Sequence, residues 1–105
     1  MESAFIDFLR LFDEEKFFEA HETLEILWRK TQTQERDFYH GLIQLAAVCV
    51  HIQRNNPQGA GTLYRKACHY LEKYLPAHEG IDLGALLQEI RQLLLSQGPF
   101  PKIRH

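Results

Sequence analysis

The sequence predicts a compact all-α protein, a bundle of about five helices with a buried central helix at about residues 35–54. The stretch from Phe38 to Ile52, FYHGLIQLAAVCVHI, would be apolar on most sides of a helix, as a buried helix is. Apolar residues recur at helical spacing in the segments around it, and sustained period-two runs and hairpin dipeptides are lacking. With 105 residues, 45% of them hydrophobic, we expect a single domain over residues 1–105.

Two amphipathic helices are predicted before the central one. The first covers about residues 4–12, where phenylalanines including Phe5 and Phe8 recur at helical spacing. The second covers about residues 16–30, and Ile26 falls opposite its apolar face. If the protein forms a homo-oligomer, we expect it to associate through Phe5, Phe8 or Ile26.

A fourth helix is predicted over about residues 57–74. Asn56 is a favourable N-cap and Pro57 is preferred just inside a helix start. The fourth helix should therefore lie antiparallel to the central helix across a very short turn. Gly41 costs about 1 kcal/mol inside a helix relative to alanine, which indicates close packing of another helix at that point.

A loop and a fifth helix complete the predicted fold. Residues 75–80 are expected to be a loop, because Pro76 and Gly80 punctuate them. Asp82 is expected to cap a leucine-rich fifth helix that ends at Gly98. In the tail that follows, two apolar residues are expected to pack onto the bundle: Phe100 and Ile103.

Charge and composition argue against several classes of function. A net charge of −2 gives no general affinity for nucleic acid. The central apolar run is too short and too interrupted to span a bilayer. The N-terminal sequence is acidic and amphipathic, which is not typical of a secretory signal. Cys49 and Cys68 lie in different segments without a C-x-x-C pair, so we expect buried reduced thiols in a cytoplasmic protein.

The strongest candidate for chemistry is the pattern His21-Glu22-x-x-Glu25 on the second helix, facing Gln44 and His51 on the third. Facing helices that present inward nitrogen and oxygen ligands are how helical bundles build metal sites. His21, Glu25 and His51 are the expected metal ligands. The expected ion is zinc, manganese or iron, since no thiolate is placed to help.

Four more residues belong to the candidate site, and two plainer interpretations stay open. Glu22 is the candidate catalytic base beside a metal-bound water. His40, Gln44 and Trp28 are expected to line the pocket. In one plainer interpretation His51 is a hydrogen-bonding partner that sets the register of two helices. In the other, the polar residues of the third helix only face solvent.

The remaining histidines are weaker candidates. His69 falls on the predicted solvent-exposed face of the fourth helix. His78 and Glu79 are adjacent in the predicted loop, and the sequence shows no matching ligand near them.

Two segments resemble the bacterial and archaeal family called domain of unknown function 309: FFEAHETLEILWRK, then FYHGLIQLAAVCVHIQRNNPQGAGTLYRKACHYLEKY. The resemblance covers about residues 12–74 and implies a compact helical fold and a metal-dependent hydrolase. The polar residues that match the motif are His21, Glu22, Glu25, Gln44 and His51, with Asn56 and Gly59 at the helix turn.

Two functions of different classes follow from the sequence. The first is a metal-binding or hydrolase-like pocket between the second and third helices. The alternative is a non-enzymatic helical interaction protein, in which exposed apolar residues join copies of the chain or a partner.

Overall fold

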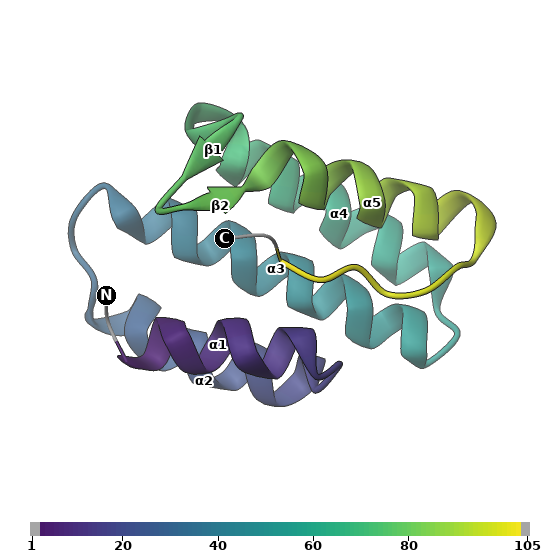
Figure 1. Ribbon diagram of the computed structural model, residues 1–105, viewed down its shortest axis with the longest axis horizontal. Coiled ribbons are helices and arrows are strands. Elements are labelled where there is room, and N and C mark those ends of the chain that lie inside the picture. Colours follow the sequence, from purple (N-terminus) through teal and green to yellow (C-terminus); the bar gives the residue numbers. More distant parts are fainter. Residues whose placement is uncertain (1–2, 104–105) are drawn as a thin grey trace.

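The computed structural model describes residues 3–103, which contain five α-helices and one small β-hairpin (Figure 1). The helices are α1 (Ser3–Asp13), α2 (Phe17–Lys30), α3 (Glu35–Gln53), α4 (Pro57–Leu71) and α5 (Leu83–Ser96). Figure 1 shows α3 in the middle, with α1 and α2 on one side and α4 and α5 on the other. The predicted all-α fold with a buried central helix is therefore confirmed. None of the helices described is both long and apolar enough to cross a membrane.

The central position of α3 follows from its apolar circumference. Its side chains contribute to the core on several sides, and Phe38, Leu42 and Leu45 are fully buried. Gly41 faces α4, where an added Cβ would overlap the side chain of Leu71. The expectation that glycine allows a helix to approach closely here is confirmed.

The turn between α3 and α4 is built as the sequence predicts. Asn55 has a left-handed backbone with φ 58°, a conformation that asparagine adopts more readily than most residues. The side chain of Asn56 accepts a hydrogen bond of 3.2 Å from the Gly59 amide and so caps α4. This short connection places α4 directly beside α3.

The segment predicted as a loop contains a β-hairpin. After α4 comes a 3₁₀ turn (Glu72–Tyr74), then β1 (Ala77–His78) and β2 (Ile81–Asp82), which pair antiparallel. Glu79 and Gly80 form the turn with φ of 52° and 75°, the positive pair that a tight hairpin requires. The loop prediction was wrong because two-residue strands are too short to show alternation, and Glu-Gly is not the usual Asn-Gly signal. Asp82 caps α5 as predicted, accepting from the Ala85 amide at 2.9 Å.

The phenylalanines of α1 are not available for association between copies. Phe5 is 2% exposed and Phe8 is fully buried, and the Phe5 ring lies 6.0 Å from that of Phe38. The expectation that they mark an oligomer contact is corrected, because both are buried in the core, where Phe38 and Tyr39 of α3 lie against the Phe5 ring. Ile26 is 58% exposed, as its position on α2 predicts.

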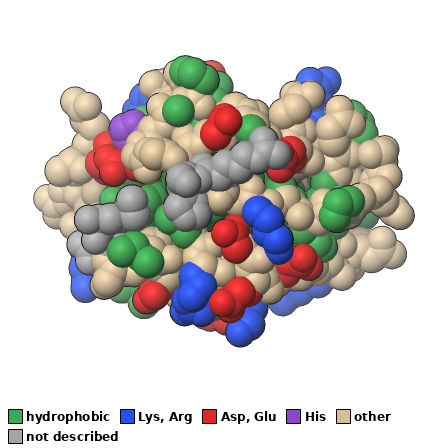
Figure 2. Space-filling view, in the orientation of Figure 1, with side chains coloured by type: hydrophobic (Ala, Val, Ile, Leu, Met, Phe, Trp, Pro, Cys, Tyr) green, Lys and Arg blue, Asp and Glu red, His purple; other side chains and the backbone are tan. Residues whose placement is uncertain are grey.

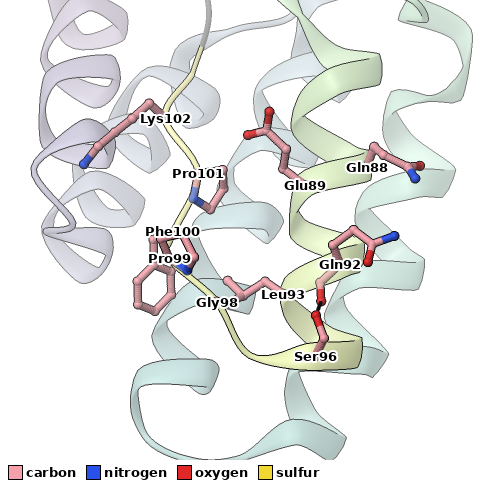
Figure 3. A pocket seen from close by; sticks show the side chains of 10 residues that line it. All are labelled: Gln88, Glu89, Gln92, Leu93, Ser96, Gly98, Pro99, Phe100, Pro101 and Lys102. Carbon is pink, nitrogen blue, oxygen red and sulfur yellow. Dashed lines mark hydrogen bonds between the residues drawn. The ribbon is translucent and has the colours of Figure 1, made fainter.

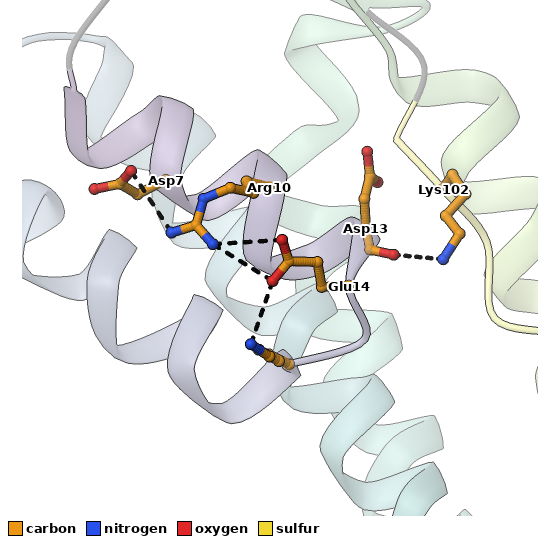
Figure 4. Close-up of polar contacts among 6 residues, drawn as sticks. Asp7, Arg10, Asp13, Glu14 and Lys102 are labelled. Atoms are coloured by element: carbon orange, nitrogen blue, oxygen red, sulfur yellow. Dashed lines mark hydrogen bonds and ion pairs between the residues drawn. The ribbon is translucent and has the colours of Figure 1, made fainter.

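The C-terminal tail runs back across the bundle and packs on the α1–α2 end. The ring of Phe100 lies 4.9 Å from that of Phe17, and Ile103 is buried, which confirms the expected packing. The Ile103 amide donates to the Asp13 carboxylate at 2.9 Å, and the Lys102 ammonium donates to the Asp13 carbonyl. Figure 4 shows Lys102 directed at Asp13 beside the exposed ion pairs of α1.

Candidate functional site

The polar strip of α3, which consists of His40, Gln44 and His51, lies between α2 and α4. All three side chains are half-buried. The His40 ring stacks on Tyr70 of α4 at 4.1 Å and lies 4.8 Å from the Trp28 ring of α2. His40 is therefore packed against both neighbouring helices, and this part of the strip is not a plain solvent face.

The surroundings of His40 disfavour its charged form. Burial lowers the pKa of His40 below its ordinary value of 6.5, and nearby Arg36 adds to this, while the charge of Asp37 opposes it. The Gln44 amide nitrogen lies 3.1 Å from the His40 Nε2. With this amide orientation Gln44 donates, so Nε2 accepts and the ring proton sits on Nδ1. The pair gives the strip one fixed polar contact.

His51 faces the start of α4. Its Nδ1 lies 3.0 Å from the side-chain nitrogen of Asn56, the residue that caps α4. A Cβ on Gly59 would stand 3.1 Å from the same Nδ1. Three residues that match the family motif thus meet at the α3–α4 turn: His51, Asn56 and Gly59.

His21 and Glu25 form a pair along α2. The His21 Nε2 lies 3.6 Å from the Glu25 Oε2, and Glu25 also accepts a hydrogen bond from Arg29. The His21 Nδ1 is buried without a hydrogen-bond partner in the described structure. Helical spacing of four residues brings the two ligand atoms together.

The other two predicted residues of α2 differ in environment. Glu22 is exposed. Trp28 is half-buried, with the Arg36 guanidinium 4.3 Å from its ring centre and a buried Nε1 that lacks a hydrogen-bond partner among the described residues. Trp28 thus packs against His40 on the α2 side of the strip.

The structure does not gather His21, Glu25 and His51 into one cluster. Among residues 3–103, one group of three possible ligands has its donor atoms all within 4.8 Å of one another: Glu35, His78 and Glu79. The expectation that His78 and Glu79 lack a matching ligand is corrected, because Glu35 supplies it. No local signal in the sequence points to this group, since Glu35 and His78 stand 43 positions apart.

A groove between α3 and α4 adjoins the polar strip. It has a volume of about 580 Å³, and its lining includes His40, Gln44, Thr62, Arg65, Lys66, His69 and Tyr70. No carboxylate is among these residues, and Arg65 and Lys66 are exposed. The groove therefore favours negatively charged molecules.

A second hollow, of about 590 Å³, lies between α5 and the C-terminal tail (Figure 3). Gln88, Gln92 and Ser96 line it from α5, and Phe100 and Lys102 from the tail. It contains none of the polar motif residues, so it is separate from the strip.

Fold and site together define a small helical domain with a polar strip along its central helix. A sequence profile of the family described as "Domain of unknown function (DUF309)" matches residues 5–63, and the chain belongs to this family. The chain is also similar to the uncharacterized protein YpuF of Bacillus subtilis (strain 168), with 37% identity over 89 residues. That match covers 81% of this chain and 51% of YpuF, so the chain spans about half the length of this curated relative.

Proposed function

We propose that the domain binds a divalent metal ion through His21 and Glu25, and that the ion and the polar strip form a hydrolase-like site. The observation that carries the proposal is the 3.6 Å distance between the His21 Nε2 and the Glu25 Oε2. Two ligand atoms at about 2.1 Å from one tetrahedral zinc ion are about 3.4 Å apart, so this spacing suits a shared ion. Zinc, manganese and iron are the proposed ions, because the ligands are nitrogen and oxygen.

The buried Nδ1 of His21 supports the same assignment. A buried polar atom without a partner calls for an explanation, commonly a water molecule or an ion at the site. Nε2 is a ligand only when the ring carries its proton on Nδ1. A water or an acceptor group at Nδ1 would hold the ring in that form, as outer partners of metal-bound histidines do.

His51 and Glu22 complete the proposed set of residues. His51 is the proposed third ligand, and to serve it must exchange its contact with the exposed Asn56 for the ion. A bound ion would lower the pKa of its water toward neutrality and so supply a hydroxide nucleophile. Glu22, which is exposed, is the proposed base.

The α3–α4 groove supports a negatively charged substrate. Its charged lining is cationic, and His40 and Gln44 belong both to the groove and to the polar strip. Arg65 and Lys66 would hold the anion, and His40, with its lowered pKa, would accept or donate hydrogen bonds without adding charge.

The test is to locate the ion. Mn²⁺ is titrated into ¹⁵N-labelled chelator-stripped protein, and the broadening of amide signals is followed. We expect broadening around residues 18–25 of α2, which is lost in His21→Ala and reduced in Glu25→Gln.

His69→Ala is the matched control, since His69 is exposed on α4. It should bind manganese as the natural sequence does. Unchanged broadening of α2 in His21→Ala, or no broadening of α2 at millimolar manganese, would contradict the proposal.

The alternative function is association through an apolar surface. Ile6, Phe18 and Ile26 of the α1–α2 pair are 50%, 48% and 58% exposed. We propose a homo-oligomer through this surface as the second candidate. Light scattering of the natural protein and of Ile26→Glu tests it: a monomer at every concentration would exclude it, and a dimer lost in the variant would support it.

A reducing, cytoplasmic location is proposed from the cysteines. Cys49 and Cys68 are free, and burial raises the pKa of the Cys49 thiol, which keeps it protonated and unreactive.

A further inference from the structure

Glu35, His78 and Glu79 meet at the end of α3 opposite to His51. Glu35 is the first residue of α3, His78 belongs to β1, and Glu79 is in the hairpin turn. The His78 Nε2 lies 2.9 Å from each carboxylate oxygen of Glu35. One donor atom from each of the three residues lies within 4.8 Å of the others. Figure 2 shows a histidine beside acidic side chains at the end of the molecule where Figure 1 places the hairpin.

Aromatic packing holds the His78 ring in place. The ring lies edge-on to Phe38 at 4.6 Å, and its centre is 4.7 Å from that of Tyr74. Phe38 is fully buried, and the Tyr74 hydroxyl donates to the Gln34 carbonyl. The imidazole is therefore directed at Glu35 by the core, an arrangement that costs little further ordering when a ligand binds.

The charge at this cluster favours a cation. Within the described residues, neither Glu35 nor Glu79 has an ion pair with a lysine or arginine. Lys73 lies nearby, but its ammonium is 2.7 Å from the Asp37 carboxylate. Two carboxylates facing one imidazole leave negative charge that a divalent ion would offset.

The cluster is also accessible. A hollow of about 520 Å³ is lined by Gln34, Glu35, Lys73, Tyr74 and His78. Glu35 and His78 are each close to 30% exposed as side chains. An ion can thus reach the ligands and keep water in its remaining positions.

We propose that Glu35, His78 and Glu79 form a second divalent metal site, which fastens the β-hairpin to the start of α3. Ligands about 2.1 Å from an ion and at right angles to each other are about 3.0 Å apart, which the 2.9 Å spacing of Glu35 and His78 matches. One nitrogen with carboxylate oxygens suits manganese or zinc. The ring binds with its proton on Nδ1, so the ion replaces the hydrogen bond between Nε2 and Glu35.

This site is independent of the function proposed above. His78 and Glu79 lie outside the residues 5–63 that match the family. Glu35 and His51 are about 24 Å apart along α3 at 1.5 Å per residue. Each site can therefore be present or absent without the other.

The same Mn²⁺ titration separates the two sites by position. We expect broadening of amides in residues 34–36 and 77–82, lost in His78→Ala and weakened at least tenfold in affinity in Glu79→Gln. His69→Ala and His21→Ala should keep it. Zinc alone should raise the unfolding temperature of the His21→Ala protein by several degrees, and this rise should vanish when His78→Ala is added.

Equal broadening of the hairpin in His78→Ala and the natural protein would overturn the proposal, and so would its absence at millimolar manganese. If His78→Ala does not fold, judged by circular dichroism, Glu79→Gln decides. Glu79 is exposed in the hairpin turn, so this variant should fold, and an unchanged affinity in it overturns the site. Broadening confined to α2 would support the His21 site and refute this one.

Discussion

The two candidate ligand groups of the molecule are built differently. His21 and Glu25 are four residues apart on α2, and helix geometry alone brings their ligand atoms to 3.6 Å. At the N-terminal end of α3, Glu35 and His78 are 43 residues apart and meet at 2.9 Å only because the hairpin folds back. A pair of the first kind can be predicted from the spacing of its residues in the sequence. A pair of the second kind forms only when the tertiary structure brings distant segments together.

The two groups also differ in what a ligand would replace. The proposed ligand atom of His21, its Nε2, lies 3.6 Å from the Glu25 Oε2, which is longer than a hydrogen bond, so an ion there would displace no formed hydrogen bond with Glu25. The His78 Nε2 already has a partner in Glu35, so an ion must replace a formed hydrogen bond. At equal ligand number, we therefore expect a given ion to bind the hairpin group with lower affinity than the His21–Glu25 pair.

The largest effect is expected from Phe38→Ala, which removes the support of the hairpin end. Phe38 is fully buried and contacts His78, so the change should cost about 3–5 kcal/mol of unfolding free energy. Urea unfolding measures it. Phe18→Ala, at a ring that is 48% exposed, should cost about 1 kcal/mol or less. Similar losses in the two variants would mean that the core does not hold the hairpin end as described.

Gly59→Ala tests the contact of His51 with the start of α4. Helix propensity alone would make alanine about 1 kcal/mol more stable. The new Cβ would instead meet Asn56 and His51, and loss of the N-cap, which costs about 1 kcal/mol, should cancel that gain or outweigh it.

Gly61→Ala is the matched control for this substitution. The nearest atom to a Cβ there is the Arg65 guanidinium at 3.9 Å, so the change should be neutral or stabilising. A stabilised Gly59→Ala protein would contradict the contact between His51 and the α4 start.

A smaller effect is expected from the contribution of His40 to the pH dependence of stability. Burial lowers the pKa of His40 in the folded protein, so near pH 6.5 and just below the unfolded chain binds more protons than the folded one. Stability should therefore fall as the pH drops through 6.5 toward the folded-state pKa, and this loss stops growing below it. Urea unfolding between about pH 8 and 5.5 should show a shallower loss in His40→Gln. Parallel curves would show that His40 does not contribute.

The smallest effect on stability is expected from Arg29→Ala. The ion pair of Arg29 with Glu25 involves an exposed arginine, so its loss should cost about 0.5 kcal/mol or less. The variant should bind Mn²⁺ more tightly at α2, because Glu25 loses a competing cation. Affinity at the hairpin should stay the same, and a change there instead would argue against two independent sites.

Much of the fold was predictable because it follows from local rules. The bounds of α2 and α3 agree with the periodicity, and Asn56 and Asp82 act as the caps their types favour. The hairpin was not predictable, since its strands are two residues long and Glu79 is an uncommon residue at positive φ. The buried state of Phe5 and Phe8 was also missed, because periodicity gives an apolar face and not the surface that covers it.

The candidate site divides in the same way. The sequence by itself determined the helices, the buried centre of α3 and the His21–Glu25 pair, because contacts within a few residues depend on backbone geometry alone. Only the tertiary structure decided that His51 turns to Asn56 and that Glu35 meets His78. Those contacts depend on how separate segments pack, and no spacing along the chain encodes that distance.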